Sequence, residues 1–350
     1  MNANFTHISP NKILPEFIIR WYFQNKRDLP WRENKEPYNV WLSEIMLQQT
    51  QVKVAASYYN RFLAELPSIG ELAAASEERL YKLWEGLGYY SRARNLQKAA
   101  NVIMREYGGI FPGDYEQILK LPGIGPYTAG AIASICFDVP VPAVDGNVLR
   151  VMARIENLAD DISSPGVKKE IRNSLSEIYP KSNCGEFTQG LIELGATVCM
   201  PGNRPKCDEC PVKNICKAFQ YGTTDIIPFK KPAKKRKHEK ITVLALVCNE
   251  KFAIRKRDEK GLLAGLWEFP NYPGRLTSEQ AISLAADLGV MPERITKTAD
   301  KKYIFTHIEW DMLFYFINCN AQSSPFIWAN EEEMRKIYTI PTAFQAPDFI

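Results

Sequence analysis

The sequence predicts an all-α region followed by a smaller α+β domain. Three observations predict this fold class. Residues 1–225 carry helix-like apolar periodicity without strand-like alternation, four closely spaced cysteines end that region, and strand and helix patterns alternate from residue 241 onward. The 350 residues suffice for two or three domains with buried cores, and 45% hydrophobic with 24% charged residues is ordinary for a globular protein.

The first region contains segments with helical periodicity and helix end signals. Residues 39–66 place apolar side chains three and four apart, as one amphipathic helix or two would. Residues 76–88 start with a Ser cap and acidic residues and end on glycine, and residues 93–109 end on paired glycines. Residues 164–179 open with Ser-Pro, which suits a helix start.

The last 110 residues mix two periodicities. A helix with a glycine stop is expected over 277–289 and a short capped helix over 329–337. The strand-like segments are 241–248, 251–257, 301–307 and 310–319. These patterns predict an α+β domain.

Basic residues gather in one short segment, residues 230–240 (KKPAKKRKHEK). It holds seven basic side chains and one acid, a local charge of +6, so the rest of the chain sums to −2. The net charge of +4 therefore gives no support for nucleic-acid binding. We interpret the segment as a solvated linker, with phosphate contact as the alternative. The longest apolar run is too short to cross a membrane and the N-terminus lacks an export signal, so we expect a cytoplasmic protein.

Four cysteines lie within eighteen residues, separated by seven, two and five residues: Cys199, Cys207, Cys210 and Cys216. Four thiolates at this density can ligate one tetrahedral metal such as zinc, or one iron–sulfur cluster. Disulfides are the alternative, but they would add little to a long chain with no sign of an oxidising compartment. The other four cysteines are expected to be small buried hydrophobes: Cys136, Cys184, Cys248 and Cys319.

Residues 121–132 (LPGIGPYTAGAI) place Gly123 and Gly125 in a turn between two helical segments. Glycines before a helix N-terminus let backbone N–H groups approach an anion, although a plain connector is the alternative. Residues 116–120 ahead of the turn read as a helix. This helix–turn–helix order argues against a P-loop or a dinucleotide-binding motif.

Two carboxylates have unusual surroundings. Asp145 precedes a glycine and a helical run, so locally it reads as an N-cap. Glu44 lies in the apolar stretch VWLSEIML, where an apolar wall would raise its pKa as a general acid at neutral pH requires. A position on the wet face of the helix is an equal alternative for Glu44.

These features resemble, over essentially the whole chain, the adenine DNA glycosylase (MutY) family of helix-hairpin-helix base-excision repair enzymes. The motifs that carry the resemblance are LPWR (29–32), VWLSEIMLQQTQV (40–52), WEGLGYYSRARNL (84–96), LPGIGPYTAGAI, PAVDGNVLRV (142–151), the cysteine group and RKRDEKGLLAGLWEFP (255–270). The resemblance implies a helical glycosylase core, with a helix-hairpin-helix subdomain and an iron–sulfur subdomain flanking a DNA groove, joined by a linker to a Nudix-like domain. The expected bounds are 30–137, 1–29 with 138–225, 226–240 and 241–350.

The resemblance also implies a [4Fe–4S] cluster on the four cysteines, with zinc as the less favoured alternative. The family's first spacing is six residues and here it is seven, which we interpret as a one-residue insertion in MPGNRPK. The implied partner is double-stranded DNA with adenine opposite 8-oxoguanine or guanine. We expect a monomer that acts at the nucleoid.

The implied mechanism extrudes adenine from the duplex into a pocket. Glu44 would protonate N7 of the base, and Asp145 would stabilise the oxocarbenium-like sugar or bond to it transiently. Tyr127 and Asn147 match positions that assist around the sugar and Asp145. Direct DNA contact is implied for the hairpin glycines Gly123 and Gly125.

Further positions follow from the same motifs. The adenine pocket is implied to contain Arg27, Trp31, Arg32, Leu47 and Gln189. Gln49 and Tyr89 match residues that wedge into the base stack, Thr50 and Leu87 would lie near 8-oxoguanine, and the family's Phe-Ser-His reading turn is represented by Phe305, Thr306 and His307. Taken singly, Trp31, Leu47 and Leu87 read as core residues.

Tyr127 separates this chain from the similar endonuclease III enzymes, which carry a lysine at that hairpin position for Schiff-base attack. A phenol cannot form the imine, and Lys120 lies outside the position, so a monofunctional glycosylase is implied. The expected Nudix helix offers only Glu279 and Asp287, too few carboxylates for a Mg²⁺-dependent hydrolase. The alternatives are a bifunctional glycosylase/lyase, a non-catalytic DNA-binding scaffold and a nucleotide hydrolase.

Overall fold

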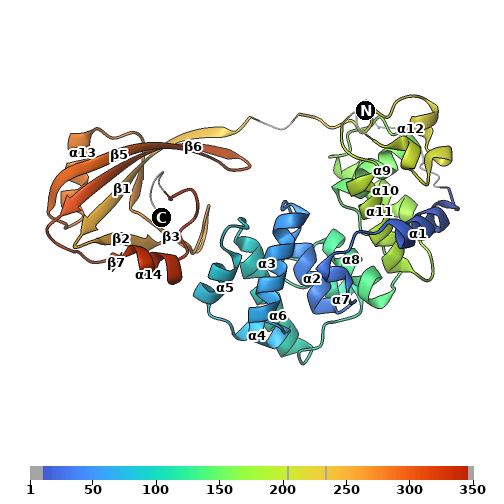
Figure 1. The fold of residues 1–350 in the computed structure, drawn as a ribbon, viewed down its shortest axis with the longest axis horizontal. Helices are drawn as coiled ribbons and strands as arrows, with labels where there is room; N and C mark the ends of the chain where they lie inside the picture. The colour runs from blue at the N-terminus through green and yellow to red at the C-terminus, as the bar shows by residue number, and fades with distance from the viewer. Residues whose placement is uncertain (1–10, 203–204, 233–234, 346–350) are drawn as a thin grey trace. The chain divides into compact units, whose positions relative to one another are not determined.

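The computed structural model describes residues 11–202, 205–232 and 235–345 and divides into two compact units (Figure 1). Described residues up to 74 form the first unit with residues 95–232, and residues 75–94 form the second unit with the C-terminal residues from 233 onward. The expected fold class, a helical region followed by an α+β domain, is confirmed. The sequence does not predict that residues 75–94 group with the C-terminal residues.

Helices build the first unit, and no strand occurs among its described residues. The bounds are α1 (Leu14–Asn25), η1 (Pro30–Arg32), α2 (Pro37–Met46), α3 (Val52–Glu65), α4 (Ile69–Ala74), α6 (Ser91–Glu106), α7 (Tyr115–Leu119), α8 (Pro126–Phe137), α9 (Gly146–Glu156), α10 (Pro165–Ile178), α11 (Cys184–Thr197), η2 (Cys207–Glu209), η3 (Lys213–Ile215) and α12 (Lys217–Gln220). Helix α6 starts in the second unit and continues in the first. The pattern over 39–66 thus forms two helices, α2 and α3.

The turn between α7 and α8 is the predicted helical hairpin. Gly123 has a φ of +76°, and a Cβ there would lie 2.5 Å from the Cβ of Asn95, so both backbone conformation and space require glycine. Gly125 is the N-cap residue of α8 with a φ of −98°, and Pro126 fills the first helical turn. Both glycines are exposed.

Helix α11 lies against α1, α8 and α9 and organises the buried core of the first unit. It is buried on several faces, because Phe187, Thr188 and Gly190 point in different directions and are all buried. A Cβ on Gly195 would lie 2.6 Å from the Cβ of Asn147, so this glycine allows α11 to approach the first turn of α9. The close packing brings side chains of both helices to one site.

The second unit contains a mixed sheet and the segment 75–94. The sheet order is β3-β2-β1-β6-β5, with β1 and β6 parallel and the other pairs on this path antiparallel; β4 pairs with β1 and β7 with β2. The bounds are α5 (Glu77–Trp84), β1 (Lys237–Cys248), β2 (Lys251–Lys256), β3 (Trp267–Glu268), β4 (Asn271–Pro273), α13 (Ser278–Asp287), β5 (Pro292–Ile304), β6 (Ile308–Cys319), β7 (Ile327–Ala329) and α14 (Glu331–Lys336).

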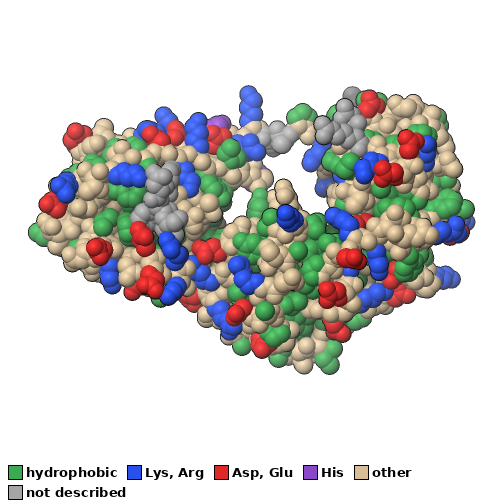
Figure 2. Space-filling view, in the orientation of Figure 1, with side chains coloured by type: hydrophobic (Ala, Val, Ile, Leu, Met, Phe, Trp, Pro, Cys, Tyr) green, Lys and Arg blue, Asp and Glu red, His purple; other side chains and the backbone are tan. Residues whose placement is uncertain are grey.

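The sheet buries both faces. Alternate residues of β1 enter two hydrophobic clusters, with Val243 in one and Leu244 in the other. Ala281 of α13 covers the Leu244 face, and Met334 of α14 belongs to the Val243 cluster. Lys, Arg, Asp and Glu side chains are interspersed over the visible surface of each unit (Figure 2).

Two sequence expectations need correction here. Strand β1 begins at Lys237, so residues 237–240 belong to the sheet rather than to the linker. Strand β5 begins at Pro292, nine residues before the expected start, because its exposed, polar sequence gives no apolar alternation. Within the described residues, no helix is long and apolar enough to span a membrane.

Segment 75–94 is tied to the C-terminal residues by polar contacts. Arg94 donates from Nη2 to the carbonyl of Ala264 at 2.6 Å, and Lys256 Nζ lies 3.0 Å from Glu77 Oε1. Lys82 Nζ donates to the carbonyl of Met334 at 3.3 Å. These contacts explain why the segment groups with the sheet in spite of its place in the sequence.

Candidate active site

A pocket of about 530 Å³ in the first unit collects side chains from η1, α2, α8, α11 and the start of α9. It brings together the predicted residues Arg27, Trp31, Arg32, Glu44, Leu47, Gln49, Thr50, Tyr127, Asp145, Asn147 and Gln189. The other lining residues were not predicted from the sequence: Leu29, Val40, Ser43, Gln48, Val52, Ile135, Ile192, Glu193 and Ala196. The two predicted catalytic carboxylates therefore line one cavity.

Glu44 lies on α2 with 8% of its surface exposed, so the alternative of a wet helix face is wrong. Tyr127, in the first turn of α8, donates its O–H to Glu44 Oε2 at 2.7 Å. Burial and the nearby carboxylates raise the pKa of Tyr127 well above its ordinary value, so the phenol stays neutral and remains a donor.

The pKa of Glu44 is raised to about 7. Burial is the main cause; the Tyr127 hydrogen bond opposes it, the Asp145 carboxylate adds to it, and Arg32 opposes it. A carboxyl group with this pKa holds a proton for about half of the time at neutral pH. Glu44 is thereby suited to general acid catalysis.

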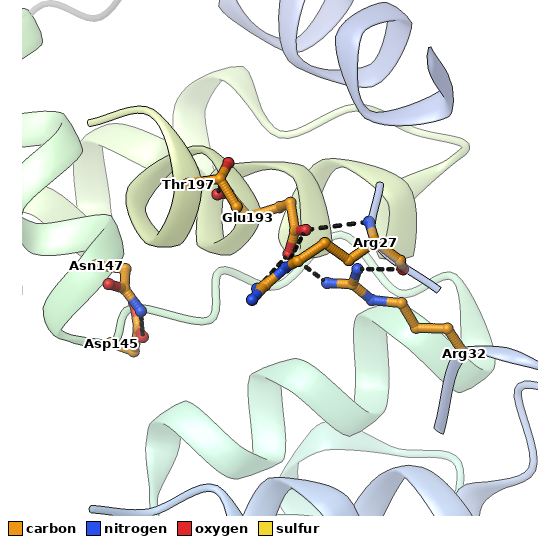
Figure 3. A network of polar contacts seen from close by, with 6 residues as sticks. All are labelled: Arg27, Arg32, Asp145, Asn147, Glu193 and Thr197. Carbon is orange, nitrogen blue, oxygen red and sulfur yellow. Dashed lines mark hydrogen bonds and ion pairs between the residues drawn. The ribbon is translucent and has the colours of Figure 1, made fainter. Parts of the chain in front are cut away.

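Asp145 is both the N-cap of α9 and a wall of the pocket. Its Oδ1 accepts from the backbone N–H of Val148 at 2.7 Å, and its Oδ2 accepts from Asn147 Nδ2 at 2.8 Å (Figure 3). Burial raises the pKa of Asp145, while these hydrogen bonds work against the rise. The local N-cap reading is confirmed, and the same geometry orients the carboxylate within the cavity.

Glu193 is a pocket residue that the sequence analysis missed. It is fully buried on α11; its Oε1 accepts from Arg27, and its Oε2 accepts from both Arg27 and Arg32 (Figure 3). Burial raises its pKa, but these arginines outweigh burial and hold the pKa at about 2. A signal was present: like Glu44, it is a single carboxylate in an apolar helical stretch (GLIELGAT).

The remaining first-unit predictions fall around this centre. Trp31 is 7% exposed and packs edge-on against Tyr59 with ring centroids 5.6 Å apart, so it is a core residue and a pocket wall at once. Gln49, between α2 and α3, has a positive φ of 58°. Gly123 and Gly125 lie at the hairpin and do not line the pocket.

Most of the residues predicted to read the lesion lie in the second unit, whereas Thr50 lines the pocket of the first unit. Tyr89 has a φ of 48° and is exposed, and its hydroxyl lies 2.7 Å from Thr306 Oγ1. Phe305 packs edge-on between Tyr303 and Trp310, each with ring centroids 4.8 Å away. His307 is exposed in the turn between β5 and β6, and Leu87 is buried. The structure thus joins residues more than 200 positions apart in sequence.

The four clustered cysteines line one small cavity beside α9. All eight cysteines of the chain are free, so the disulfide alternative is wrong. Arg154, 2% exposed, donates from Nη1 to Cys199 Sγ at 3.3 Å and to the carbonyl of Met200 at 2.8 Å. Cys136 is only half-buried, which corrects the expectation that it is a buried hydrophobe.

The four thiols around this cavity are the donor set that a [4Fe–4S] cluster takes, with one thiolate at each of four irons. Four thiolates are also a ligand set of tetrahedral zinc. No group of three or more His, Cys, Asp or Glu side chains in the described ranges is gathered around a single metal position. The proposed insertion in MPGNRPK falls partly on residues 203–204, outside the described residues.

Comparison with known proteins defines the class first. Residues 42–181 match the HhH-GPD superfamily of base excision DNA repair proteins, and residues 242–346 match the NUDIX domain. The fold and the pocket agree with this class, a helix-hairpin-helix DNA glycosylase followed by a NUDIX domain.

Individual relatives then narrow the class. The adenine DNA glycosylase of Schizosaccharomyces pombe is 31% identical over 91% of this chain and 83% of its own length. The adenine DNA glycosylase of Mus musculus is 36% identical, with coverages of 83% and 68%, and that of Buchnera aphidicola subsp. Acyrthosiphon pisum is 37% identical, with 75% of each. The chain belongs to the adenine DNA glycosylase family, whose members hydrolyse N-glycosidic bonds, and the resemblance in the sequence motifs is confirmed.

Solved structures share the fold of the helical part. A thermostable thymine-DNA glycosylase has a TM-score of 0.53 and 26% identity and covers 60% of this chain and 96% of its own. A trapped endonuclease III–DNA covalent intermediate has a TM-score of 0.51 and 23% identity, with coverages of 61% and 99%.

Proposed function

We propose that this enzyme excises adenine mispaired with 8-oxoguanine, and with guanine, and leaves an abasic site. The observation that carries the proposal is that a buried glutamate with a pKa of about 7, Glu44, and a second carboxylate, Asp145, line one pocket. The glycosidic bond is inaccessible within a duplex, so the adenosine nucleotide enters the pocket extruded from the stack.

Glu44 is the proposed general acid. In its protonated form it transfers a proton to N7 of adenine, which turns a poor anionic leaving group into a neutral one. Tyr127 holds the carboxyl group through its O–H, and burial keeps the proton on Glu44 up to neutral pH.

Asp145 is the proposed partner of the sugar. As the glycosidic bond breaks, positive charge develops on the ring oxygen and anomeric carbon, and a carboxylate beside them lowers the energy of that state. Asn147 Nδ2 and the N–H of Val148 fix the two oxygens of Asp145, so the negative charge needs little reorganisation.

The reaction stops at the abasic site because the pocket offers a phenol at the hairpin position. Imine formation with the ring-opened sugar needs an amine, and Tyr127 has none. No lysine lines the pocket among the described residues, and Lys120 is at the end of α7. This favours hydrolysis over lyase chemistry.

The second unit is the proposed reader of the opposite base. Tyr89, Leu87 and the turn at Phe305–His307 belong to one unit, and the contact between Tyr89 and Thr306 couples the two loops. The hydroxyl of Thr306 can both donate and accept a hydrogen bond, as recognition of a modified purine requires.

The proposed cofactor is a [4Fe–4S] cluster held by Cys199, Cys207, Cys210 and Cys216. When bound, it cross-links the loop that follows α11. Arg154 supports that loop from α9 through the carbonyls of Met200 and Gly202, and it also donates to the carbonyl of Ile227 beyond α12.

One assay tests the proposed reaction. The protein is incubated with a duplex that holds one adenine opposite 8-oxoguanine, and the strands are analysed with and without hot alkali. Strand cleavage only after alkali is the expected result. Direct nicking would favour a glycosylase/lyase, and an intact strand after alkali would favour a binding scaffold.

A further inference from the structure

Glu193 is the most deeply buried charge of the pocket and has no role in the mechanism above. Its side chain has no exposed surface, whereas Arg27 and Arg32 beside it are 39% and 10% exposed. A carboxylate is costly to bury unless it is fully paired. Its retention at the pocket wall therefore points to a task at this site.

The carboxylate of Glu193 joins two segments of the pocket. Oε1 accepts from the backbone N–H of Arg27 at 3.1 Å and from its Nε at 2.6 Å. Oε2 accepts from Arg27 Nη2 at 2.9 Å and from Arg32 Nη2 at 2.8 Å. Arg32 Nη1 closes the ring by donating to the carbonyl of Arg27 at 3.0 Å. Figure 3 shows that both guanidinium groups point toward Glu193, which is a residue of α11.

The clamp leaves donors for a ligand. A guanidinium has five N–H groups, and the contacts above involve two nitrogens of each arginine. Both arginines line the pocket, so their remaining N–H groups can meet the acceptor nitrogens of a purine ring. With the clamp intact, two positive charges and one negative charge leave a net charge of +1 near Glu44.

We infer that Glu193 is a positioning residue that fixes Arg27 and Arg32 as purine-binding donors and shields Glu44 from the positive charge of Arg32. This inference rests on the proposed function of the pocket. The first part of the role is geometric and the second is electrostatic, and the two have different consequences when Glu193 is changed.

The electrostatic part depends on the groups around Glu44. These are Tyr127 and Cys136 of α8, Asp145 before α9, and Arg32 of η1. Arg32 lowers the pKa of Glu44. Without the charge of Glu193, Arg32 acts on Glu44 unopposed, so the pKa of Glu44 falls and the protonated general acid is lost at a lower pH.

The test compares Glu193→Gln with Glu186→Gln in the full-length holoenzyme. Glu186 is a matched control: it lies on the same helix and pairs with Lys35 at 2.7 Å, but it does not line the pocket. Single-turnover adenine excision is measured from pH 5 to 9 with a duplex containing adenine opposite 8-oxoguanine. For Glu193→Gln we expect the alkaline limb to move to lower pH by at least about 0.5 unit and the rate at pH 7.5 to fall about tenfold. For Glu186→Gln we expect the alkaline limb to lie at the same pH as in the native enzyme.

Two further variants separate charge from folding. Glu193→Asp keeps the charge, so we expect the limb to return to the native position. Arg27→Gln removes one positive charge, so the negative charge of Glu193 then balances Arg32 alone. We therefore expect the alkaline limb to move to higher pH. This result does not depend on whether Glu193→Gln folds. An unmoved limb in Glu193→Gln, or a shift to lower pH in Arg27→Gln, would overturn the inference.

A titration without substrate tests this inference independently of the proposed function. The carboxyl ¹³C resonance of Glu44, assigned by comparison with Glu44→Gln, is titrated in the native protein and in Arg27→Gln. A higher midpoint in Arg27→Gln supports the shielding even if the native enzyme fails to excise adenine. An equal or lower midpoint overturns it.

Discussion

Two buried glutamates of one pocket have opposite pKa shifts, because their partners differ. Glu44 receives one hydrogen bond from a neutral phenol, so burial prevails and its pKa is about 7. Glu193 is paired with two guanidinium groups, which prevail over burial and hold its pKa at about 2. The first can deliver a proton at neutral pH, and the second remains a fixed charge. Burial alone therefore does not identify a general acid, because the hydrogen-bond and ion-pair partners of a buried carboxylate decide the direction of its pKa shift.

The phenol of Tyr127 gives a test at this scale. Its O–H stabilises the charged form of Glu44, so Tyr127→Phe should raise the pKa of Glu44. Because the reaction needs protonated Glu44, the alkaline limb of the pH–rate profile should then move to higher pH. Single-turnover rates across pH measure this shift. A limb at lower pH in Tyr127→Phe would contradict the assigned hydrogen bond.

Part of the site could be predicted from single residues. The spacing of Cys199, Cys207, Cys210 and Cys216 predicted a shared ligand site, and they do line one cavity. The local sequence around Glu44 was equally compatible with a solvent-exposed glutamate, and that around Asp145 indicated only an N-cap. The family motifs were needed to predict a catalytic role for both. Glu193 was not predicted, because its meaning depends on Arg27, which is 166 residues away in the sequence.

At the scale of elements, the helical hairpin depends on one backbone conformation. Gly123→Ala should destabilise the protein by about 1–2 kcal/mol for the left-handed backbone, and further because Asn95 must move. Gly125→Ala is the matched control, since its φ is −98° and a Cβ there meets nothing within 4 Å; the loss of a glycine N-cap should cost only about 0.5–1 kcal/mol. Urea unfolding of both variants measures the difference. Equal losses would contradict the role given to Gly123.

Element ends were predictable where capping residues mark them. Ser76 caps α5 and Asn330 caps α14 in a full capping box, as the sequence indicated. The predicted strand was shorter than β5, because most side chains of β5 are exposed and polar and give no apolar alternation. Its hydrogen-bonded pairing with β6 defines the full length of the strand. Helix α11 lacks a clear apolar stripe because α1, α8 and α9 all pack on it.

For the whole molecule, the two units do not follow the linear order of the sequence. Residues 75–94 interrupt the helical region and join the C-terminal sheet through contacts such as that between Arg94 and Ala264. Sequence periodicity could not show this grouping, because α5 is an ordinary amphipathic helix whichever partner it packs on. Only the tertiary contacts assign residues 75–94 to the second unit.

The contact between Tyr89 and Thr306 connects the two sequence regions of the second unit and gives a test at this scale. Thr306→Ala removes the hydroxyl next to Tyr89, so the preference for adenine opposite 8-oxoguanine over adenine opposite guanine should fall by up to about tenfold. Thr306→Ser should keep the preference, since it keeps the hydroxyl. The ratio of single-turnover rates on the two duplexes is the measurement. An unchanged ratio in Thr306→Ala would show that Thr306 takes no part in reading the opposite base.

In the proposed mechanism, Glu44 supplies the proton that releases adenine. Glu44→Gln keeps the size of the side chain and an oxygen for Tyr127, but it has no acidic proton. Single-turnover excision by this variant is measured at pH 7 beside its affinity for the same duplex. We expect a rate at least about 10³-fold lower with affinity retained. Excision at a near-native rate would contradict it.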